Sequence, residues 1–215
     1  MKKLLDRIKL CMLPPPQRRS LPYECYWEDS ILAQEQERIF SNQWLGLGRS
    51  DRLQNPGEYE AFELCGQALV LIRNQDKELR LYANTCRHRG AKLLDGTGQC
   101  QAISCPFHGW TYSLDGNLKH AKTMAENSSF DFADNSLIEY KLKELQGFLF
   151  GFLGNTPTDL SNQLGNFSEL HQPWSMNELV TTRRASFEVQ CNWKAFLDVF
   201  NEYYHLNNVH PTSID

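Results

Sequence analysis

Two pairs of cysteine and histidine constrain this chain more than any other feature of its sequence. Cys86 and His88 stand in the segment CRHRG, and Cys105 and His108 stand in the segment CPFHGW. The pattern is C-x-H, then sixteen residues, then C-x-x-H. Two thiolates and two imidazoles can hold one zinc ion tetrahedrally, or a [2Fe–2S] cluster with both cysteines on one iron and both histidines on the other.

The spacing of the first pair favours the cluster over zinc. Zinc sites usually separate their first two ligands by two to four residues, whereas only one residue separates Cys86 from His88. In a cluster the two irons are separate atoms, so each box can supply one ligand to each iron. We therefore expect the two boxes at two hairpin tips, with Gly90 and Gly109 letting the backbone approach the sulfides and offer N–H groups to them.

The residues around the two boxes resemble the Rieske motif of ring-hydroxylating oxygenases. These neighbours are Arg87, Arg89, Gly90, Pro106, Gly109 and Trp110. The Rieske proteins of respiratory chains add a further cysteine to each box, and this chain has no such pair. The resemblance implies a [2Fe–2S] cluster bound by Cys86, His88, Cys105 and His108, with a potential of roughly −150 to +300 mV.

The segment NWKAFLDVFNEYYHLNNVHP, near the end of the chain, carries a second group of metal-binding residue types. Asp198, Glu202 and His205 are four and three residues apart, so a helix over about 193–208 would place them on one face. The proline after His210 disfavours helical backbone there, so the helix should bend or end and bring His205 and His210 round to one metal. Two histidines and a carboxylate form the facial triad of non-haem Fe(II) oxygenases.

This segment resembles the start of the catalytic domain in the same oxygenase family. The resemblance implies that His205 and His210 bind a mononuclear Fe(II), and that Glu202 bridges His205 to His108 of the partner subunit for electron transfer. Di-iron carboxylate proteins need two Glu-x-x-His motifs, and this chain has one. A glutamate at position 202, where most of the family has aspartate, resembles a smaller group that oxidises quaternary ammonium compounds such as carnitine.

The rest of the sequence predicts an α+β fold built on an antiparallel sheet. Short strand-forming runs are separated by turn residues: EYEAFEL (58–64), QALVLIR (67–73), LRLY (79–82) and GFLFGFL (147–153). Asp115-Gly116 indicates a tight turn between Tyr112 and Leu118. The pattern also predicts helices over the first ten residues, 28–41 and 160–170, and a strand over 185–190.

We expect three segments along the chain. They are a helical segment at 1–42, a Rieske domain at 43–154 with its boundary near Gly154, and the start of a helix-grip catalytic domain at 155–215. The resemblance implies a third iron ligand far downstream of His210, and Asp215 is an unlikely substitute. We therefore expect the sequence to be part of a longer subunit; the alternative is that a partner supplies the rest.

Composition excludes several other classes of protein. The net charge of −4 offers no general attraction to nucleic acid or acidic membranes. No apolar run approaches the roughly 18–20 residues that a bilayer span needs, and charges interrupt the N-terminal apolar stretch before a signal peptide forms. Seven cysteines is an odd number, which favours reduced thiols and a cytoplasmic location over a disulfide framework.

The resemblance implies a terminal oxygenase component. Electrons would come from NAD(P)H through a reductase, with or without a ferredoxin, and O₂ would hydroxylate or dihydroxylate a small organic substrate. Arenes, aromatic acids and alkylammonium compounds all remain open as substrates. The family's usual assembly implies a homotrimer or an α3β3 complex. The alternatives are a stand-alone Rieske-type electron carrier with a non-catalytic tail and a zinc-binding interaction module.

Overall fold

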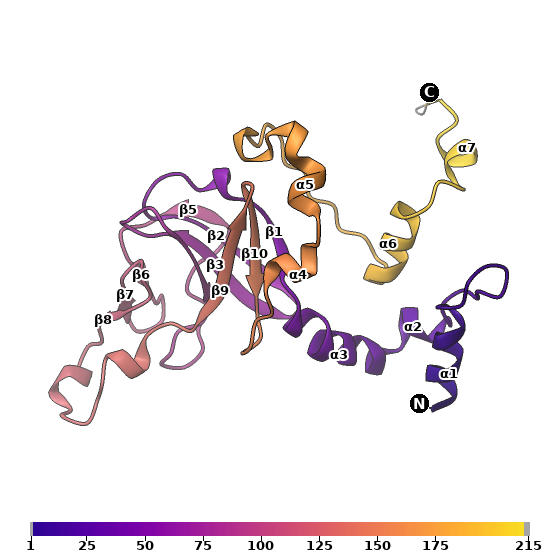
Figure 1. Ribbon diagram of the computed structural model, residues 1–215. Coiled ribbons are helices and arrows are strands. Elements are labelled where there is room, and N and C mark those ends of the chain that lie inside the picture. Colours follow the sequence, from indigo (N-terminus) through magenta and orange to yellow (C-terminus); the bar gives the residue numbers. More distant parts are fainter. Residues whose placement is uncertain (1, 213–215) are drawn as a thin grey trace. The chain divides into compact units, whose positions relative to one another are not determined.

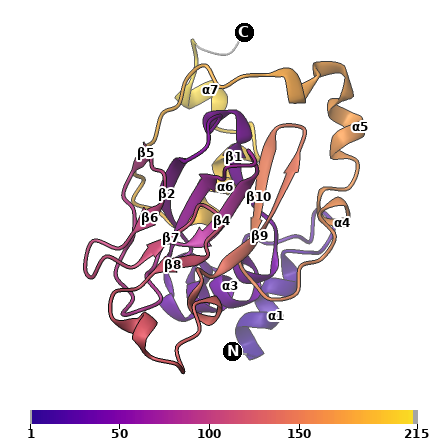
Figure 2. The same ribbon diagram turned by 90° about the vertical axis from the view of Figure 1, so that its left-hand side faces the viewer.

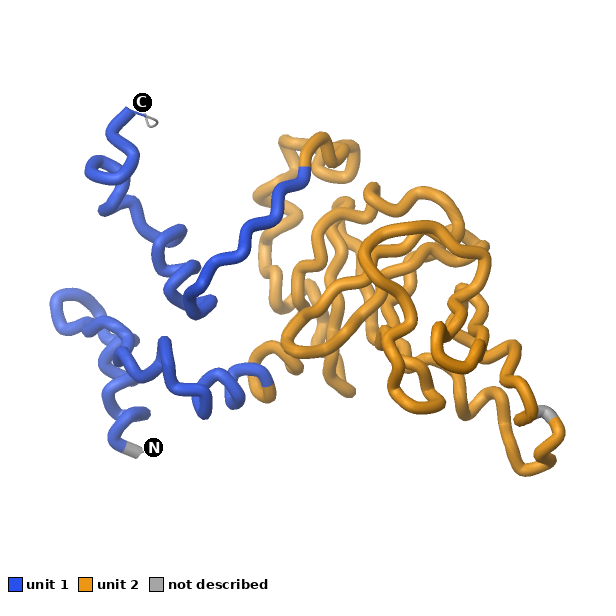
Figure 3. The backbone as a smooth tube through the Cα atoms, turned by 180° about the vertical axis from the view of Figure 1, so that it is seen from behind, with its two compact units in different colours: residues 1–36, 184–215 blue, residues 37–183 orange. Residues whose placement is uncertain are grey.

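The computed structural model describes residues 2–212 of the chain (Figure 1). They form two compact units, one of residues 37–183 and one that joins residues 1–36 to residues 184–215 (Figure 3). Asp215 lies outside the described residues. The N-terminal helices and residues 184–212 belong to one unit, and the three segments expected from the sequence remain a prediction.

The larger unit is built on antiparallel strands, as the sequence predicted. A seven-stranded sheet has the order β1-β10-β9-β4-β3-β2-β5, and a three-stranded sheet has the order β6-β7-β8 (Figure 2). The strands of the large sheet are β1 (Leu45–Arg49), β2 (Glu58–Leu64), β3 (Gln67–Arg73), β4 (Leu79–Ala83), β5 (Thr97–Gln99), β9 (Glu139–Leu145) and β10 (Phe148–Phe152). Those of the small sheet are β6 (Ile103–Ser104), β7 (Thr111–Tyr112) and β8 (Leu118–His120).

Strand β3 is buried on both faces, which explains its unbroken apolar run. Side chains alternate across a strand, so Leu69 and Leu71 face one way and Val70 and Ile72 the other. The first pair packs in a core with Leu81 and Leu149. The second pair packs in a core with residues of the small sheet and of both Cys–His boxes: Cys86, Cys105, Trp110 and Tyr112.

The helices are short and lie mainly near the ends of the chain. They are α1 (Lys2–Leu10), α2 (Glu24–Trp27), α3 (Asp29–Arg38), α4 (Leu160–Leu164), α5 (Phe167–His171), α6 (Trp193–Phe200) and α7 (Leu206–Val209). Single 3₁₀ turns occupy Phe40–Asn42, Ser50–Arg52, Met124–Glu126, Ala133–Asn135, Gln172–Trp174 and Met176–Glu178. None of the helices in residues 2–212 has the length and apolar character needed to cross a bilayer.

Three predictions of local structure were wrong. The helix over 160–170 is two helices, because Gly165 has a φ of 56° and ends α4. The helix over 193–208 breaks after Phe200, so Asp198 lies on α6 while Glu202 and His205 lie in the turn that follows. The segment 185–190 forms no strand, since it pairs with no other strand among the described residues and leaves Phe187 83% exposed.

Candidate metal sites

Two loops carry the first Cys–His constellation. The loop with Cys86 and His88 follows β4 and is closed by an isolated bridge between Thr85 and Lys92. The loop with Cys105 and His108 joins β6 to β7, where Ser104 pairs with Thr111. The expectation that each box lies at its own hairpin tip agrees with this arrangement.

The two loops have the same backbone hydrogen-bond pattern. In each, the N–H of the cysteine donates to the carbonyl five residues later: Cys86 to Ala91 and Cys105 to Trp110, both at 2.8 Å. In each, a glycine four residues after the cysteine donates its N–H back to the cysteine carbonyl, at 2.9 Å and 3.0 Å. Each of these similarly closed loops carries one thiol and one imidazole.

The two loop glycines act through their backbone conformation. Gly90 and Gly109 both have a φ of 72°, in the left-handed region that other residues rarely adopt. Their N–H groups donate to the carbonyls of Cys86 and Cys105. The expectation that these N–H groups are offered to sulfides was therefore wrong, because they close the loops.

The two thiols are buried in the core of the larger unit. Cys86 is 4% exposed and Cys105 is 5% exposed. The Tyr112 hydroxyl lies 3.3 Å from Cys86 Sγ and accepts the backbone N–H of Arg87 at 3.1 Å. Burial is the largest cause that raises the pKa of Tyr112, so this hydroxyl stays neutral.

The two imidazoles lie nearer the surface and close to each other. The rings of His88 and His108 have centroids 4.8 Å apart and are tilted by 63°. His88 also stacks on Trp110, with centroids 4.8 Å apart and an interplanar angle of 11°. Desolvation, followed by the charges of His108 and Arg89, lowers the pKa of His88, which favours the neutral form that binds metals.

Asn84 closes the base of the first loop. Its side chain is fully buried, and its Nδ2 donates to the carbonyl of Leu94 at 2.7 Å while its Oδ1 accepts the N–H of Leu94 at 3.0 Å. The backbone N–H of Leu93 also donates to the Asn84 carbonyl. The sequence reasoning missed both Asn84 and Tyr112. The available signal was position: Asn84 stands two residues before Cys86, and Tyr112 stands two residues after Trp110.

This arrangement fits a binuclear cluster with two protein ligands on each iron. The two cysteines belong to one buried cluster and the two imidazoles contact each other nearer the surface, so each iron would take one kind of ligand. Within residues 2–212 no group of three or more His, Cys, Asp or Glu side chains is arranged to hold one metal ion. A cluster requires only pairs, because its sulfides complete the coordination of each iron.

The second constellation follows α6. The rings of His205 and His210 have centroids 5.8 Å apart and are tilted by 72°. Metal–nitrogen bonds to imidazole are about 2 Å long, so rings at this separation can share one ion. The break before His205 and the single turn of α7 bring them together, and α7 ends at His210 as the following proline predicted.

Glu202 holds the ring and the backbone of His205. Its carboxylate contacts His205 Nδ1 and accepts the backbone N–H groups of Tyr204 and His205. Hydrogen bonding from the His205 side chain is the largest cause that lowers the pKa of Glu202. With Nδ1 engaged, Nε2 is the His205 nitrogen that remains for a metal.

Asp198 has a separate role from Glu202. It lies on α6 and accepts a hydrogen bond from Tyr26 Oη at 2.6 Å. Glu35 on α3 accepts two further bonds from the start of α6, from Trp193 Nε1 at 2.9 Å and from Lys194 Nζ at 2.7 Å. The N-terminal helices therefore fix α6, the element that immediately precedes Glu202.

Comparisons with protein families match two parts of the chain. Residues 43–141 match the Rieske [2Fe-2S] domain, and residues 176–215 match the ring hydroxylating alpha subunit (catalytic domain). Rieske domains hold a [2Fe–2S] cluster, and ring-hydroxylating oxygenases also use a mononuclear iron.

Individual relatives match most of the chain. The carnitine monooxygenase oxygenase subunit of Escherichia coli (strain K12) is 32% identical over 92% of this chain and 54% of its own length. The glycine betaine monooxygenase oxygenase subunit of Chromohalobacter salexigens is 29% identical over 89% of this chain and 43% of its own. The crystal structure of a quaternary ammonium Rieske monooxygenase in complex with L-carnitine superposes with a TM-score of 0.84 at 33% identity, over 90% of this chain and 57% of that one. The chain thus spans about half the length of the relatives it matches.

Proposed function

The chain belongs to the Rieske-type ring-hydroxylating oxygenases, and on that premise we propose that it is part of a terminal oxygenase component. In this proposal the whole protein uses O₂ and electrons to hydroxylate an organic substrate. The observation that carries the proposal is that one chain has two separate arrangements of side chains of the kind that bind metals. Paired loops present two thiols and two imidazoles, and a broken helix presents two further imidazoles 5.8 Å apart.

The first arrangement would bind the cluster through Cys86, Cys105, His88 and His108. A [2Fe–2S] cluster transfers one electron at a time, and a mononuclear iron supplies O₂ activation. Burial of the two cysteines protects their thiolates from water and oxidants, while the two imidazoles lie on the exposed side where an electron partner can approach. The stacking of His88 on Trp110 fixes the plane of that ring.

The second arrangement would bind the mononuclear iron through His205 and His210. Glu202 supports this role because it occupies His205 Nδ1 and so orients the ring with Nε2 outward. We further propose that in a trimer the same carboxylate also reaches His108 of the partner subunit. A carboxylate can accept N–H bonds from two imidazoles at once, which would orient both rings.

A quaternary ammonium compound is the substrate class that the comparisons favour. The names of both relatives and of the solved structure refer to carnitine, glycine betaine or a quaternary ammonium compound. Glu202 in place of the more common aspartate pointed in the same direction.

We propose an NAD(P)H-dependent reductase as the electron partner and a homotrimer as the assembly.

The test is to measure iron, zinc and acid-labile sulfide in protein prepared anaerobically with added iron. Filling of both sites gives about three irons for every two sulfides. The His205→Ala/His210→Ala double variant should fall to about two irons for every two sulfides, and Cys105→Ser should lose the sulfide. His120→Ala and His171→Ala, which change histidines outside both sites, should match the parent.

The same measurement separates the proposal from its rivals. In the complete subunit, two irons for every two sulfides, unchanged by the double variant, would indicate an electron carrier with a non-catalytic tail. Zinc without sulfide would exclude the Rieske assignment. Substrate class is then tested on the complete oxygenase by comparing O₂ uptake with L-carnitine, glycine betaine and an aromatic acid.

A further inference from the structure

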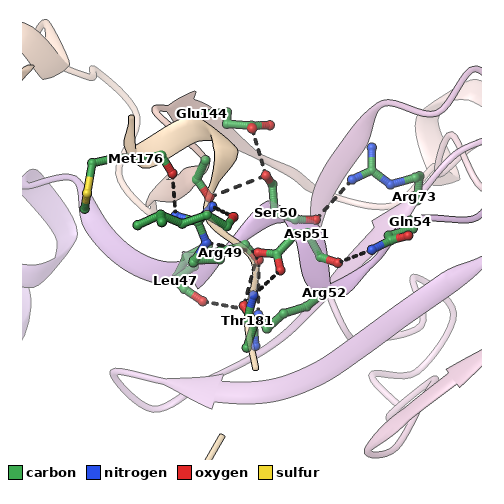
Figure 4. Close-up of polar contacts among 12 residues, drawn as sticks. Leu47, Arg49, Ser50, Asp51, Arg52, Gln54, Arg73, Glu144, Met176 and Thr181 are labelled. Carbon is green, nitrogen blue, oxygen red and sulfur yellow. Dashed lines mark hydrogen bonds and ion pairs between the residues drawn. The ribbon is translucent and has the colours of Figure 1, made fainter. Parts of the chain in front are cut away.

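The segment after α5 is held against the first strand of the large sheet by two charged side chains. Arg49 ends β1 and Asp51 lies in the 3₁₀ turn that follows it. Figure 4 shows both side chains reaching the segment that contains Met176 and Thr181. All of these residues belong to the unit of residues 37–183.

Arg49 binds two backbone carbonyls of the segment. Its Nη1 donates to Met176 O at 3.1 Å, and its Nη2 donates to Leu179 O. The guanidinium also lies 5.1 Å from the centroid of the Phe148 ring. A side chain at position 147 would occupy the same space, since a Cβ on Gly147 would lie 2.6 Å from Arg49 Nη2.

Asp51 binds the segment at one further residue. Its Oδ2 accepts the backbone N–H of Thr181 at 2.6 Å, and its Oδ1 accepts the Thr181 hydroxyl at 3.1 Å. Asp51 also pairs with Arg49 Nε at 3.1 Å, and the two side chains are only 19% and 15% exposed. The Thr181 N–H is the largest cause that lowers the pKa of Asp51.

Apolar burial does not account for the position of this segment. Within residues 176–181, Leu179 is 47% exposed and Val180 is 68% exposed, and Met176 is half-buried. The polar bonds to Arg49 and Asp51 are therefore the main interactions that fix residues 176–181 on the sheet.

The catalytic-domain match begins at residue 176, inside this held segment. We propose that Arg49 and Asp51 are positioning residues that hold the first residues of the catalytic part on the Rieske domain, an inference that rests on the proposed oxygenase function. Residues 176–181, where the match to the catalytic domain begins, are then held on the sheet by side chains of the Rieske domain.

The structural test uses protease cleavage after Glu178 and hydrogen exchange of the Thr181 amide. Arg49→Ala and Asp51→Asn should each raise both rates about tenfold, because the segment opens locally. Thr181→Val, which removes one hydroxyl bond and keeps the N–H, should have a smaller effect. Arg80→Ala is the matched control, because Arg80 pairs with Glu78 and Glu139 on the same sheet and should leave both rates unchanged.

The functional test uses the complete, iron-loaded oxygenase with its reductase. Arg49→Ala and Asp51→Asn should keep the parent's iron and sulfide content, cluster spectrum and midpoint potential, while product formed per O₂ consumed falls severalfold. Arg49→Lys, which keeps the charge and one donor direction, should recover part of that ratio.

The outcomes separate this inference from the proposed function. Parent-like cleavage and exchange in both variants would show that Arg49 and Asp51 do not hold residues 176–181. An opened segment with an unchanged product-to-O₂ ratio would overturn the positioning role. If the parent binds no mononuclear iron, the proposed function fails. The cleavage and exchange results still decide whether Arg49 and Asp51 hold residues 176–181.

Discussion

The hydroxyl oxygen of Tyr112 lies 3.3 Å from the sulfur of Cys86. The N–H of Arg87 already donates to this hydroxyl, so the hydroxyl hydrogen is available to the sulfur. A thiolate that binds iron carries no proton, and the pKa of Tyr112 is raised by burial. Tyr112 is therefore the donor whenever the cluster is bound.

We predict that Tyr112→Phe lowers the midpoint potential of the cluster. A hydrogen bond to a ligand sulfur stabilises the more negatively charged, reduced state. If that bond is worth about 1 kcal/mol more in the reduced state, the decrease is on the order of 40 mV. Redox titration followed by the cluster's visible spectrum measures it.

Tyr82→Phe is the matched control for this substitution. Tyr82 is as buried as Tyr112, but its hydroxyl lies 3.5 Å from the carbonyl of Leu114 and contacts neither cysteine. The midpoint potential of the cluster in Tyr82→Phe should equal that in the parent. Equal decreases in the two variants would mean that the Tyr112 hydroxyl has no specific effect on the cluster.

The strands that were predicted well are those specified by local sequence. Residues 58–64 and 67–73 are strands β2 and β3 with the expected bounds, because their patterns end at turn residues on both sides. The turn at Asp115-Gly116 also exists, with Gly116 at a φ of 76° between paired Tyr112 and Leu118. In each case the information lies within a few residues.

The wrong predictions concern structure that depends on distant partners. The segment 185–190 alternates as a strand does, but a strand needs a neighbour to satisfy its backbone groups, and alternation does not reveal whether one exists. The break after Phe200 depends on Glu202, whose carboxylate takes the N–H groups of the next turn. A carboxylate at helical spacing looks the same in sequence whether it continues a helix or ends one.

The ligand-type residues of the site were recognisable from sequence, and their supporting residues were not. Cysteine and histidine are chemically distinctive, so their spacing alone indicates a metal. Tyr112 reaches Cys86 across 26 residues, and Asn84 reaches Leu94 across ten. These contacts exist only once the loops have closed, and tyrosine and asparagine occur in many other settings. The metal-ligand roles of the six cysteines and histidines remain predictions, and the variants above test those of Cys105, His205 and His210.

We predict that Asn84→Ala destabilises the protein and lowers the cluster content. The substitution leaves the N–H and the carbonyl of Leu94 without these partners in a partly buried place, which costs up to about 1–3 kcal/mol for each group. The free energy of unfolding in urea and the sulfide content per chain measure the two effects. Asn162→Ala, at an exposed position on α4, should change neither. A stable Asn84→Ala variant with full sulfide content would show that the first loop closes without this side chain.

Gly57 and Gly66 lie on either side of β2, and their substitution by alanine provides a matched pair of variants that tests the close approach of Gly57 to Cys100. Both have a positive φ, of 83° and 74°. A Cβ on Gly57 would lie 2.0 Å from the carbonyl oxygen of Cys100, whereas a Cβ on Gly66 would meet nothing within 4 Å. Gly66→Ala should therefore cost about 1 kcal/mol from backbone strain alone. Gly57→Ala should cost about 3 kcal/mol or more, because the backbone must move. Equal losses in urea unfolding would contradict the close approach at Cys100.

The pairing of Tyr26 with Asp198 predicts a pH dependence at the alkaline end. The hydrogen bond to Asp198 is the largest cause that raises the pKa of Tyr26 to about 12. The ordinary pKa of tyrosine is about 10. Because the folded value is the higher one, this contact stabilises the folded state fully below about pH 10, and the stabilisation is lost as the pH rises from about 10 to about 12.

Asp198→Asn should bring the Tyr26 pKa back towards the ordinary value, because an amide carries no charge to oppose the phenolate. Ultraviolet titration of the parent, with the curve of Tyr26→Phe subtracted, isolates this one tyrosine. Asp134→Asn changes an exposed aspartate elsewhere and should leave the Tyr26 curve in place. If the parent's Tyr26 titrates near pH 10, the contact between α2 and α6 does not form in solution, whereas the bonds from Glu35 to α6 are unaffected by this result.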